Sequence, residues 1–275
     1  MNPYLVEDPE DPLIADFLRL DDHKLRQERE LPNGDMAGFF LAEGDQVIER
    51  ALATGHKLST LIVDANRRKP LPASIPEMTK ILLCKESALV AISGRSSLKD
   101  PIGSFIRPPP LFLEDALQLS KTIVVTESIT NPTNMGALFR NAAALDADLV
   151  CVDSTSCDPL YRRAVRVSMG QVFSIKHVRA DHINDLFERL NSSGFTCFAL
   201  TLESDAEDIS NLKLEEETQV AMFVGAEGSG LTKATVDKCD HKIRIPMNQN
   251  VDSLNVGTAL AVALYVTREK RRSGL

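Results

Sequence analysis

Hydrophobic and polar positions along the second half of the chain predict strands and helices in alternation. Short apolar runs predict strands at residues 122–126, 147–152, 196–201, 219–224 and 242–245. The stretches between them have helical spacing and predict helices at 134–145, 158–169 and 183–191. A last helix is predicted from 253 to 272, with one apolar stripe. Continuous apolar strands between helices indicate an α/β domain with a mostly parallel sheet, covered on both faces.

The first hundred residues carry a shorter version of this pattern. Residues 12–31 predict a leading helix or pair of helices, which Pro32-Asn33-Gly34 ends. The pattern then predicts strands at 38–42, 58–63 and 81–84, with helices at 43–54 and 87–92. The prolines between 101 and 110 disfavour a helix or a central strand and favour a stiff extended segment. We therefore expect an N-terminal α/β domain over 1–107, a linker over 108–120 and a second domain over 121–275.

Composition excludes several classes of protein. The chain has 275 residues, 43% of them hydrophobic, which is enough for two domains that each bury a core. The five cysteines form no CxxC pair and are odd in number, so we expect reduced thiols and neither a disulfide framework nor a metal site. No run of about 18 apolar residues predicts a membrane span. The N-terminus is acidic, unlike a signal peptide, and we expect a cytoplasmic protein.

A net charge of -8 argues against a surface that is positive all over. Any contact with nucleic acid is then expected at local basic clusters. We choose the cluster formed by Arg162, Arg163 and Arg166 as the candidate substrate-binding surface.

Three segments in the second half combine glycines, amides and a charge at places where a predicted strand ends. They are Asn131-Pro132-Thr133-Asn134-Met135-Gly136 with Arg140, then Gly225-Ala226-Glu227-Gly228-Ser229-Gly230, and Ile245-Pro246-Met247 leading to Ser253-Leu254-Asn255-Val256. Open α/β sheets build ligand sites where strands give way to loops.

Some of these polar residues also have a structural explanation. Asn134 and Ser253 could each be an N-cap. Asn255 has a poor helix propensity and could point toward Asn134 and Glu227. Arg140 interrupts an alanine-rich helix face, so its guanidinium requires a carboxylate, a phosphate or open solvent.

The glycine-rich segment does not fit the two common nucleotide-binding patterns. A phosphate-binding P-loop requires lysine where this chain has Leu231. The first strand-to-helix turn of the predicted sheet has Asn134-Met135-Gly136 and not GxGxxG. A nucleotide-dependent enzyme is therefore disfavoured.

At these residues the sequence closely resembles the SpoU, or TrmH-like, RNA ribose 2'-O-methyltransferases of the SPOUT class. The family's Asn-x-Gly-x-x-x-Arg, Gly-x-Glu-x-x-Gly-Leu and Ile-Pro-Met to Ser-Leu-Asn-Val motifs are present in order. An Arg-x-Ser-x-Gly stretch is matched by Arg166-Val167-Ser168-Met169-Gly170. Residues 39–61 also resemble the ribosomal-protein-like domain that often precedes the catalytic domain. One departure is Asn131, where many relatives have aspartate.

The resemblance implies a fold and a reaction. It implies a C-terminal domain threaded as a trefoil knot, a homodimer, S-adenosylmethionine as cofactor and rRNA or tRNA as substrate. Arg140 would act on the ribose 2'-hydroxyl, and the other catalytic-site residues are expected to be Asn134, Glu227, Ser253 and Asn255. The expected cofactor-binding residues are Thr201, Gly225, Ile245 and Leu254. The alternative is an RNA-binding protein of the same fold that transfers no methyl group.

Overall fold

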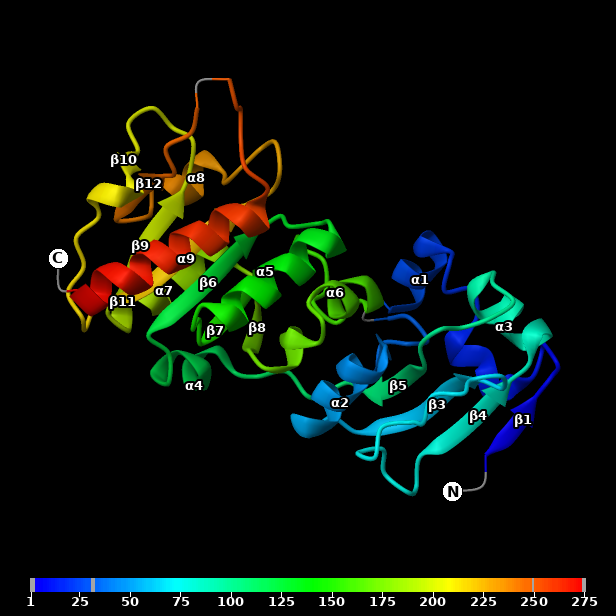
Figure 1. Ribbon diagram of the computed structural model, residues 1–275. Helices are drawn as coiled ribbons and strands as arrows, with labels where there is room; N and C mark the ends of the chain where they lie inside the picture. Colours follow the sequence, from blue (N-terminus) through cyan, green and yellow to red (C-terminus); the bar gives the residue numbers. More distant parts are fainter. Residues whose placement is uncertain (1–2, 31–32, 249, 274–275) are drawn as a thin grey trace. The chain divides into compact units, whose positions relative to one another are not determined.

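The computed structural model describes residues 3–30, 33–248 and 250–273 and divides the chain into two compact units (Figure 1). Unit 1 consists of Met1–Pro109 together with Leu160–Phe173, and unit 2 of Pro110–Pro159 together with Ser174–Leu275. The chain thus leaves unit 2 after Pro159, contributes one segment to unit 1 and returns at Ser174. This excursion was not predicted from the sequence, where residues 121–275 form one expected domain.

Unit 1 contains a five-stranded mixed sheet in the order β1-β4-β3-β5-β2. β1, β4 and β3 are parallel, and β5 is antiparallel to both β3 and β2. The strands are β1 (Tyr4–Val6), β2 (Phe39–Glu43), β3 (Leu58–Asp64), β4 (Lys80–Cys84) and β5 (Ile102–Ile106). The helices are η1 (Pro12–Phe17), α1 (His23–Glu30), α2 (Asp45–Ala53), α3 (Glu86–Ser93), α6 (Arg162–Val167) and η2 (Gln171–Phe173).

The segment between the two expected domains is more structured than predicted. Residues 102–106 form β5, which is a central strand, although the prolines were expected to prevent one. The reason is that Pro101 and Pro108 flank the strand and leave its own amide donors intact. Within the expected linker, residues 113–118 form α4 (Leu113–Gln118), whose Ala116 and Leu117 belong to the hydrophobic core of unit 2. A chain that buries apolar side chains in this way is part of a domain.

Unit 2 contains a seven-stranded sheet in which every neighbouring pair is parallel. Its order is β10-β12-β9-β11-β6-β7-β8. The strands are β6 (Thr122–Glu127), β7 (Leu149–Asp153), β8 (Lys176–Ala180), β9 (Phe195–Leu200), β10 (Glu207–Asp208), β11 (Gln219–Gly225) and β12 (His241–Arg244). The predicted parallel α/β sheet is confirmed, and the knot stays a prediction.

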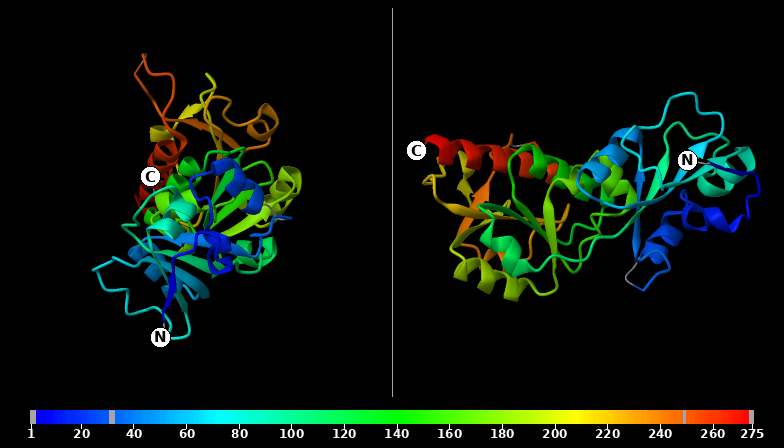
Figure 2. Two further views of the ribbon diagram at one scale, coloured as in Figure 1. Left: turned by 90° about the vertical axis from the view of Figure 1, so that its right-hand side faces the viewer. Right: turned by 90° about the horizontal axis from the view of Figure 1, so that it is seen from below.

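Helices cover both faces of this sheet, as the view from below in Figure 2 shows. α5 (Pro132–Ala144) and α9 (Val256–Ser273) lie on one face, while α4 and α7 (Ile183–Ser192) lie on the other. On the second face the ring of Phe187 from α7 stacks on Phe223 from β11, with ring centroids 4.6 Å apart. η3 (Ile209–Asn211) and α8 (Lys233–Val236) complete the unit. Burial on both faces explains why the central strands β6, β7, β9 and β11 are mostly apolar.

Candidate active site

The expected site residues gather at the carboxyl edge of the parallel sheet in unit 2. Thr201 follows β9, Gly225 ends β11 and Ile245 follows β12, and these three strands are neighbours. The Thr201 N–H donates to the carbonyl of Ile243, 3.0 Å away, which joins the ends of β9 and β12. On the other side of β11 lies β6, which leads into α5. β7 and β8 extend the sheet on one side of the β6–β11 pair, and β9, β12 and β10 extend it on the other. A point where the strand order reverses in this way is where open α/β sheets bind ligands.

Asn255 connects the three sequence motifs through one side chain. Its Nδ2 donates to Asn134 Oδ1 at 3.0 Å and to Glu227 Oε1 at 2.6 Å. Its Oδ1 accepts from the N–H of Gly257 at 3.0 Å and of Thr258 at 3.4 Å. These last two bonds make Asn255 the N-cap of α9. The expected juxtaposition of Asn134, Glu227 and Asn255 is therefore confirmed.

Two helix starts differ from the prediction. α5 begins at Pro132, and Asn131, not Asn134, is its N-cap, accepting from the Thr133 N–H at 2.8 Å. Proline is favoured in the first turn because its missing N–H is not needed there. Ser253 is exposed, lies before α9 and makes no polar contact with the described part of the chain. Asn255 caps α9 in its place. Because Asn131 caps α5, Asn134 has no capping role, and its side chain bonds to Asn255 in the site.

The glycine-rich loop is held in a tight reversal. The Gly230 N–H donates to the Ala226 carbonyl at 2.9 Å, and a Cβ added to Gly225 would lie 2.2 Å from Gly230 C. Gly228 has φ +88°, and the space on its Cβ side is open. This position favours glycine and leaves the loop backbone accessible to a ligand.

Arg140 stands apart from these contacts. Its side chain is exposed on α5, and no described residue forms a hydrogen bond or ion pair with it. Of the three partners considered from the sequence, the guanidinium has open solvent. It is therefore free to bind an anion such as an RNA phosphate.

The region expected to bind the cofactor has exposed apolar side chains. Leu202 after β9 is 61% exposed, and Val251 and Leu254 after β12 are 47% and 36% exposed. Apolar side chains that follow neighbouring strands suit a ligand that carries a flat base. The residues present therefore fit a nucleoside-containing methyl donor.

A model of the SpoU rRNA Methylase family matches residues 121–265. An uncharacterized tRNA/rRNA methyltransferase of Mycobacterium tuberculosis is 32% identical over 271 residues, covering 98% of this chain and 92% of that relative. The chain belongs to the SpoU rRNA methylase family. Membership confirms the class predicted from the motifs, a methyltransferase that acts on RNA.

Two further relatives of this SpoU methylase bear on the fold and on the reaction. A crystal structure of an AdoMet-bound rRNA methyltransferase from Sinorhizobium meliloti has a TM-score of 0.79 at 24% identity, covering 96% of this chain and 97% of that one. The 23S rRNA (guanosine(2553)-2'-O)-methyltransferase RlmP of Bacillus subtilis is 24% identical over 229 residues, covering 83% of this chain and 88% of that relative. The first shares the parallel α/β fold, and the second is a ribose methyltransferase.

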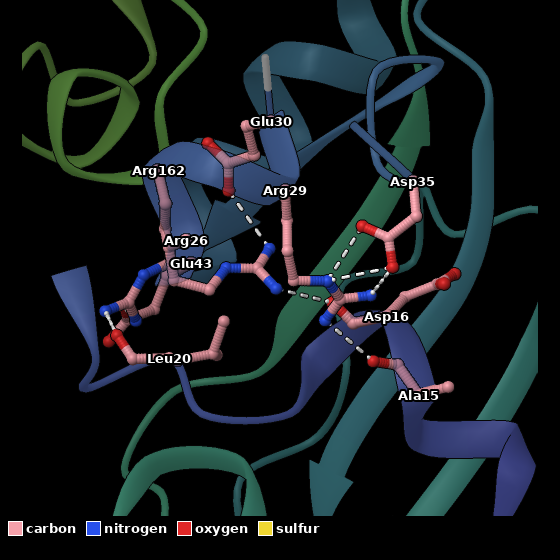
Figure 3. A network of polar contacts seen from close by, with 9 residues as sticks. All are labelled: Ala15, Asp16, Leu20, Arg26, Arg29, Glu30, Asp35, Glu43 and Arg162. Carbon is pink, nitrogen blue, oxygen red and sulfur yellow. Dashed lines mark hydrogen bonds and ion pairs between the residues drawn. The ribbon is translucent and has the colours of Figure 1, made fainter. Parts of the chain in front are cut away.

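The basic cluster chosen as a substrate-binding surface lies on α6, within unit 1, and Figure 3 shows its first member, Arg162. Arg162 donates to Glu43 Oε2 at 2.8 Å and to the Leu20 carbonyl at 2.9 Å. Arg166 forms an ion pair with the other oxygen of Glu43 at 3.0 Å, and its side chain is 58% exposed. Burial lowers the pKa of the Arg162 guanidinium, which the negative charge of Glu43 opposes. Arg162 is thus committed to internal contacts, whereas Arg163 and Arg166 are exposed.

Sequence reasoning missed two buried carboxylates at the same sheet edge. Asp153 at the end of β7 accepts from the Ser128 N–H and from the hydroxyl groups of Thr155 and Ser156, which fixes the loop before α5. Glu127 at the end of β6 accepts three hydrogen bonds from Thr232 and Thr235. An acidic residue directly after an apolar strand was the sequence signal that could have identified them.

In the described ranges, no helix has the length and the apolar composition of a membrane span, and no cluster of three or more His, Cys, Asp or Glu is arranged to hold a metal.

Proposed function

We propose that this SpoU methylase transfers a methyl group to a ribose 2'-hydroxyl of rRNA or tRNA. The observation that carries the proposal is the hydrogen-bonded bridge from Asn134 through Asn255 to Glu227, with Arg140, which has no partner among the described residues, further along the same helix α5 as Asn134. A ribose 2'-hydroxyl is a weak acid and lies beside a phosphate. Its methylation is therefore helped by a guanidinium that binds the phosphate and by amides that position the site. The similarity to RlmP supports the choice of ribose over base.

The proposed cofactor site lies along the carboxyl ends of β9, β11 and β12. Thr201, Gly225, Ile245 and Leu254 would hold S-adenosylmethionine through backbone groups and apolar contact. Its sulfonium supplies the activated methyl group. The task left to the protein is to align the hydroxyl with that methyl group and to exclude competing orientations.

Arg140 is proposed to act as a cation and not as a base. An arginine is effectively always protonated in proteins, so its guanidinium cannot accept the hydroxyl proton. It would bind the phosphate next to the reacting ribose and stabilise the negative charge that develops on the 2'-oxygen. The proton would leave through that phosphate or through water, while Asn134, Glu227 and Asn255 brace the site. Ser253, exposed before α9, is proposed to line it.

The test compares Arg140→Ala with Arg140→Lys. We expect the alanine variant to lose at least about 100-fold in methyl transfer at saturating cofactor, as when a charge-stabilising group is removed. The lysine variant keeps the charge and should retain part of the rate. Calorimetry should find cofactor affinity unchanged in both, because Arg140 lies outside the cofactor residues. Near-normal transfer by the alanine variant would contradict the role given to Arg140.

RNA contact is proposed for the exposed members of the α6 cluster and for unit 1. Arg163→Glu and Arg166→Glu should weaken RNA binding and reduce its salt dependence, because each arginine lost removes a phosphate contact and the counterion release that goes with it. Arg162 is a poor reporter, because it is bonded to Glu43 and Leu20. An unchanged affinity and salt slope in both variants would place the RNA elsewhere.

The homodimer and the trefoil knot implied by the resemblance belong to the same proposal. On α9, Tyr265 is 52% exposed, and an aromatic side chain of this kind is favoured at protein interfaces. Light scattering should therefore give twice the chain mass, and Tyr265→Glu should shift the protein toward the monomer. A monomeric wild-type protein would overturn the dimer and leave the methyl transfer untouched.

A further inference from the structure

A buried carboxylate at the end of β6 has no part in the reaction proposed above. Glu127 is 8% exposed. One oxygen accepts from the Thr232 N–H at 2.9 Å, and the other accepts from the hydroxyl groups of Thr232 at 2.9 Å and Thr235 at 2.8 Å. Both threonines follow the glycine-rich loop, and Thr232 is the N-cap of α8. A buried carboxylate with several donors is a strong link between the segments it joins.

The same residue also holds the start of that loop. In the ladder between β11 and β6, Gly225 is the register partner of Glu127. The chain then passes through Ala226 to Gly230, reverses, and reaches Thr232 on the Glu127 carboxylate. Both ends of residues 225–232, which we call the glycine loop, are therefore fixed to one residue, by backbone at one end and by side chain at the other.

The shape of the glycine loop matters for the site. It carries Glu227, which accepts the 2.6 Å hydrogen bond from Asn255. It also carries Gly228 and Gly230, which both have positive φ angles. Because glycine has no Cβ, these two residues give the loop many alternative conformations when it is released. A loop of this kind binds a ligand well only if it is ordered in advance, because otherwise binding must supply the ordering free energy.

We propose that Glu127 is a positioning residue that holds the glycine loop in the conformation that binds the methyl donor. The proposal rests on the proposed function, since it assumes that this loop contacts S-adenosylmethionine. Glu127 itself touches neither cofactor nor RNA in this account. Its effect is on cofactor affinity and not on the rate of transfer once the cofactor is bound.

The test uses the full-length protein and isothermal calorimetry with S-adenosylhomocysteine. Glu127→Ala removes all three contacts and should weaken binding by at least about tenfold, with kcat at saturating cofactor changed less than about threefold. Glu127→Gln should rescue binding to within about threefold, because its oxygen can accept from the Thr232 N–H while its amide donates to the two hydroxyl oxygens. Thr235→Val removes one of the three contacts. It replaces Glu127→Ala in the same binding measurement if Glu127→Ala does not fold.

Asp153→Ala is the matched control. Asp153 is 7% exposed, ends the next strand of the same sheet and binds the other loop, so its loss removes a comparable buried carboxylate without touching the glycine loop. We expect a similar fall in melting temperature with cofactor affinity changed less than about threefold. Equal loss of affinity in both variants, or unchanged affinity in Glu127→Ala, would overturn the proposal. A wild-type protein that does not bind S-adenosylhomocysteine would instead overturn the proposed function.

Discussion

At the scale of single residues, the site depends on an asparagine that has two tasks. Asn255 caps α9 with its oxygen and joins Asn134 to Glu227 with its nitrogen. Because both hydrogens of Nδ2 are used, the orientation of its amide is fixed by two independent sets of partners. One side chain thus sets both the start of the last helix and the spacing of the three motifs.

These two tasks can be separated by Asn255→Asp. Aspartate keeps the capping oxygen, so α9 should remain capped, but it loses the donor and places a second carboxylate beside Glu227. We expect a loss of roughly 10- to 100-fold in kcat/KM, since the hydrogen bond to a charged partner is worth about 1.5–3 kcal/mol. Steady-state methyl transfer measures it.

The double variant Asn255→Asp with Glu227→Gln is the control for that prediction. Glutamine can donate to the new carboxylate, so part of the loss should be recovered, and the cycle of variants isolates the coupling. Strictly additive effects of the two substitutions would contradict a direct link between residues 255 and 227.

The sequence identifies the residues of the site better than the atoms that join them. The spacing of Asn134, Glu227 and Asn255 in three motifs was enough to expect that they meet. The exchange of caps was not predictable, because Asn131 and Asn134 are both good capping residues, as are Ser253 and Asn255. Which of each pair caps a helix depends on where the loop leaves the sheet, and that is a tertiary property.

At the scale of elements, α6 is held in unit 1 by charge. Glu43 at the end of β2 accepts from Arg162 (Figure 3). It also forms an ion pair with Arg166, and its side chain is only 13% exposed. An arginine left without its carboxylate in such a setting carries an uncompensated, partly buried charge.

Glu43→Gln should therefore destabilise unit 1 by about 1–3 kcal/mol, the cost of losing hydrogen bonds to charged groups. Urea unfolding measures the loss, and hydrogen exchange should show faster opening of residues 160–173. Arg19→Gln is the matched control, because it breaks the ion pair between Arg19 and Asp22. The Arg19 side chain is 63% exposed and the Asp22 side chain 31% exposed. Such a surface pair contributes little to stability, because water and salt screen it. Equal effects of the two substitutions would contradict the structural role of Glu43.

An aromatic cluster packs η2 against β2 and gives unit 1 a pH dependence. The His56 ring lies 5.5 Å from Phe40 and 4.9 Å from Phe173, centroid to centroid. Burial lowers the pKa of His56 from its usual value of 6.5. His56 therefore binds a proton less readily in the folded protein than in the unfolded chain. The stability that neutral His56 contributes is present above pH 6.5 and is lost as the pH falls below it.

Melting temperatures between pH 7.5 and 5.5 test this expectation. The wild-type protein should lose stability toward pH 5.5, and His56→Gln should remove part of that slope while lowering stability at pH 7.5. A variant with the same slope as the wild type would show that His56 does not titrate in this range.

Some elements could not be predicted from local pattern. β10 has two residues, β8 alternates charged and apolar positions on a sheet edge, and α8 has four residues. Segments this short carry too few positions for a periodicity to emerge. β5 was missed for a different reason: the prolines around it are real breakers, but they stand outside the strand and not within it.

At the scale of the whole molecule, the excess of acidic residues and an RNA substrate are compatible. The net charge is -8, and several basic side chains form ion pairs within the protein. Arg67 and Lys69, for example, both pair with Asp45. The proposed RNA contact then depends on a few exposed arginines, not on the overall charge. The fold class was predictable because the central strands of the parallel sheet are mostly apolar. The insertion of 160–173 into unit 1 was not, because it depends on contacts such as Arg162 with Glu43, more than a hundred residues apart.

The central claim is that the chain methylates a ribose hydroxyl of RNA. The most direct measurement is transfer of labelled methyl from S-adenosylmethionine to unmodified rRNA and tRNA, followed by nucleoside analysis of each fraction. The account predicts a 2'-O-methylated nucleoside in one fraction with wild-type protein, and its loss with Arg140→Ala. Label on a base, or no label from a protein that binds S-adenosylhomocysteine, would contradict it.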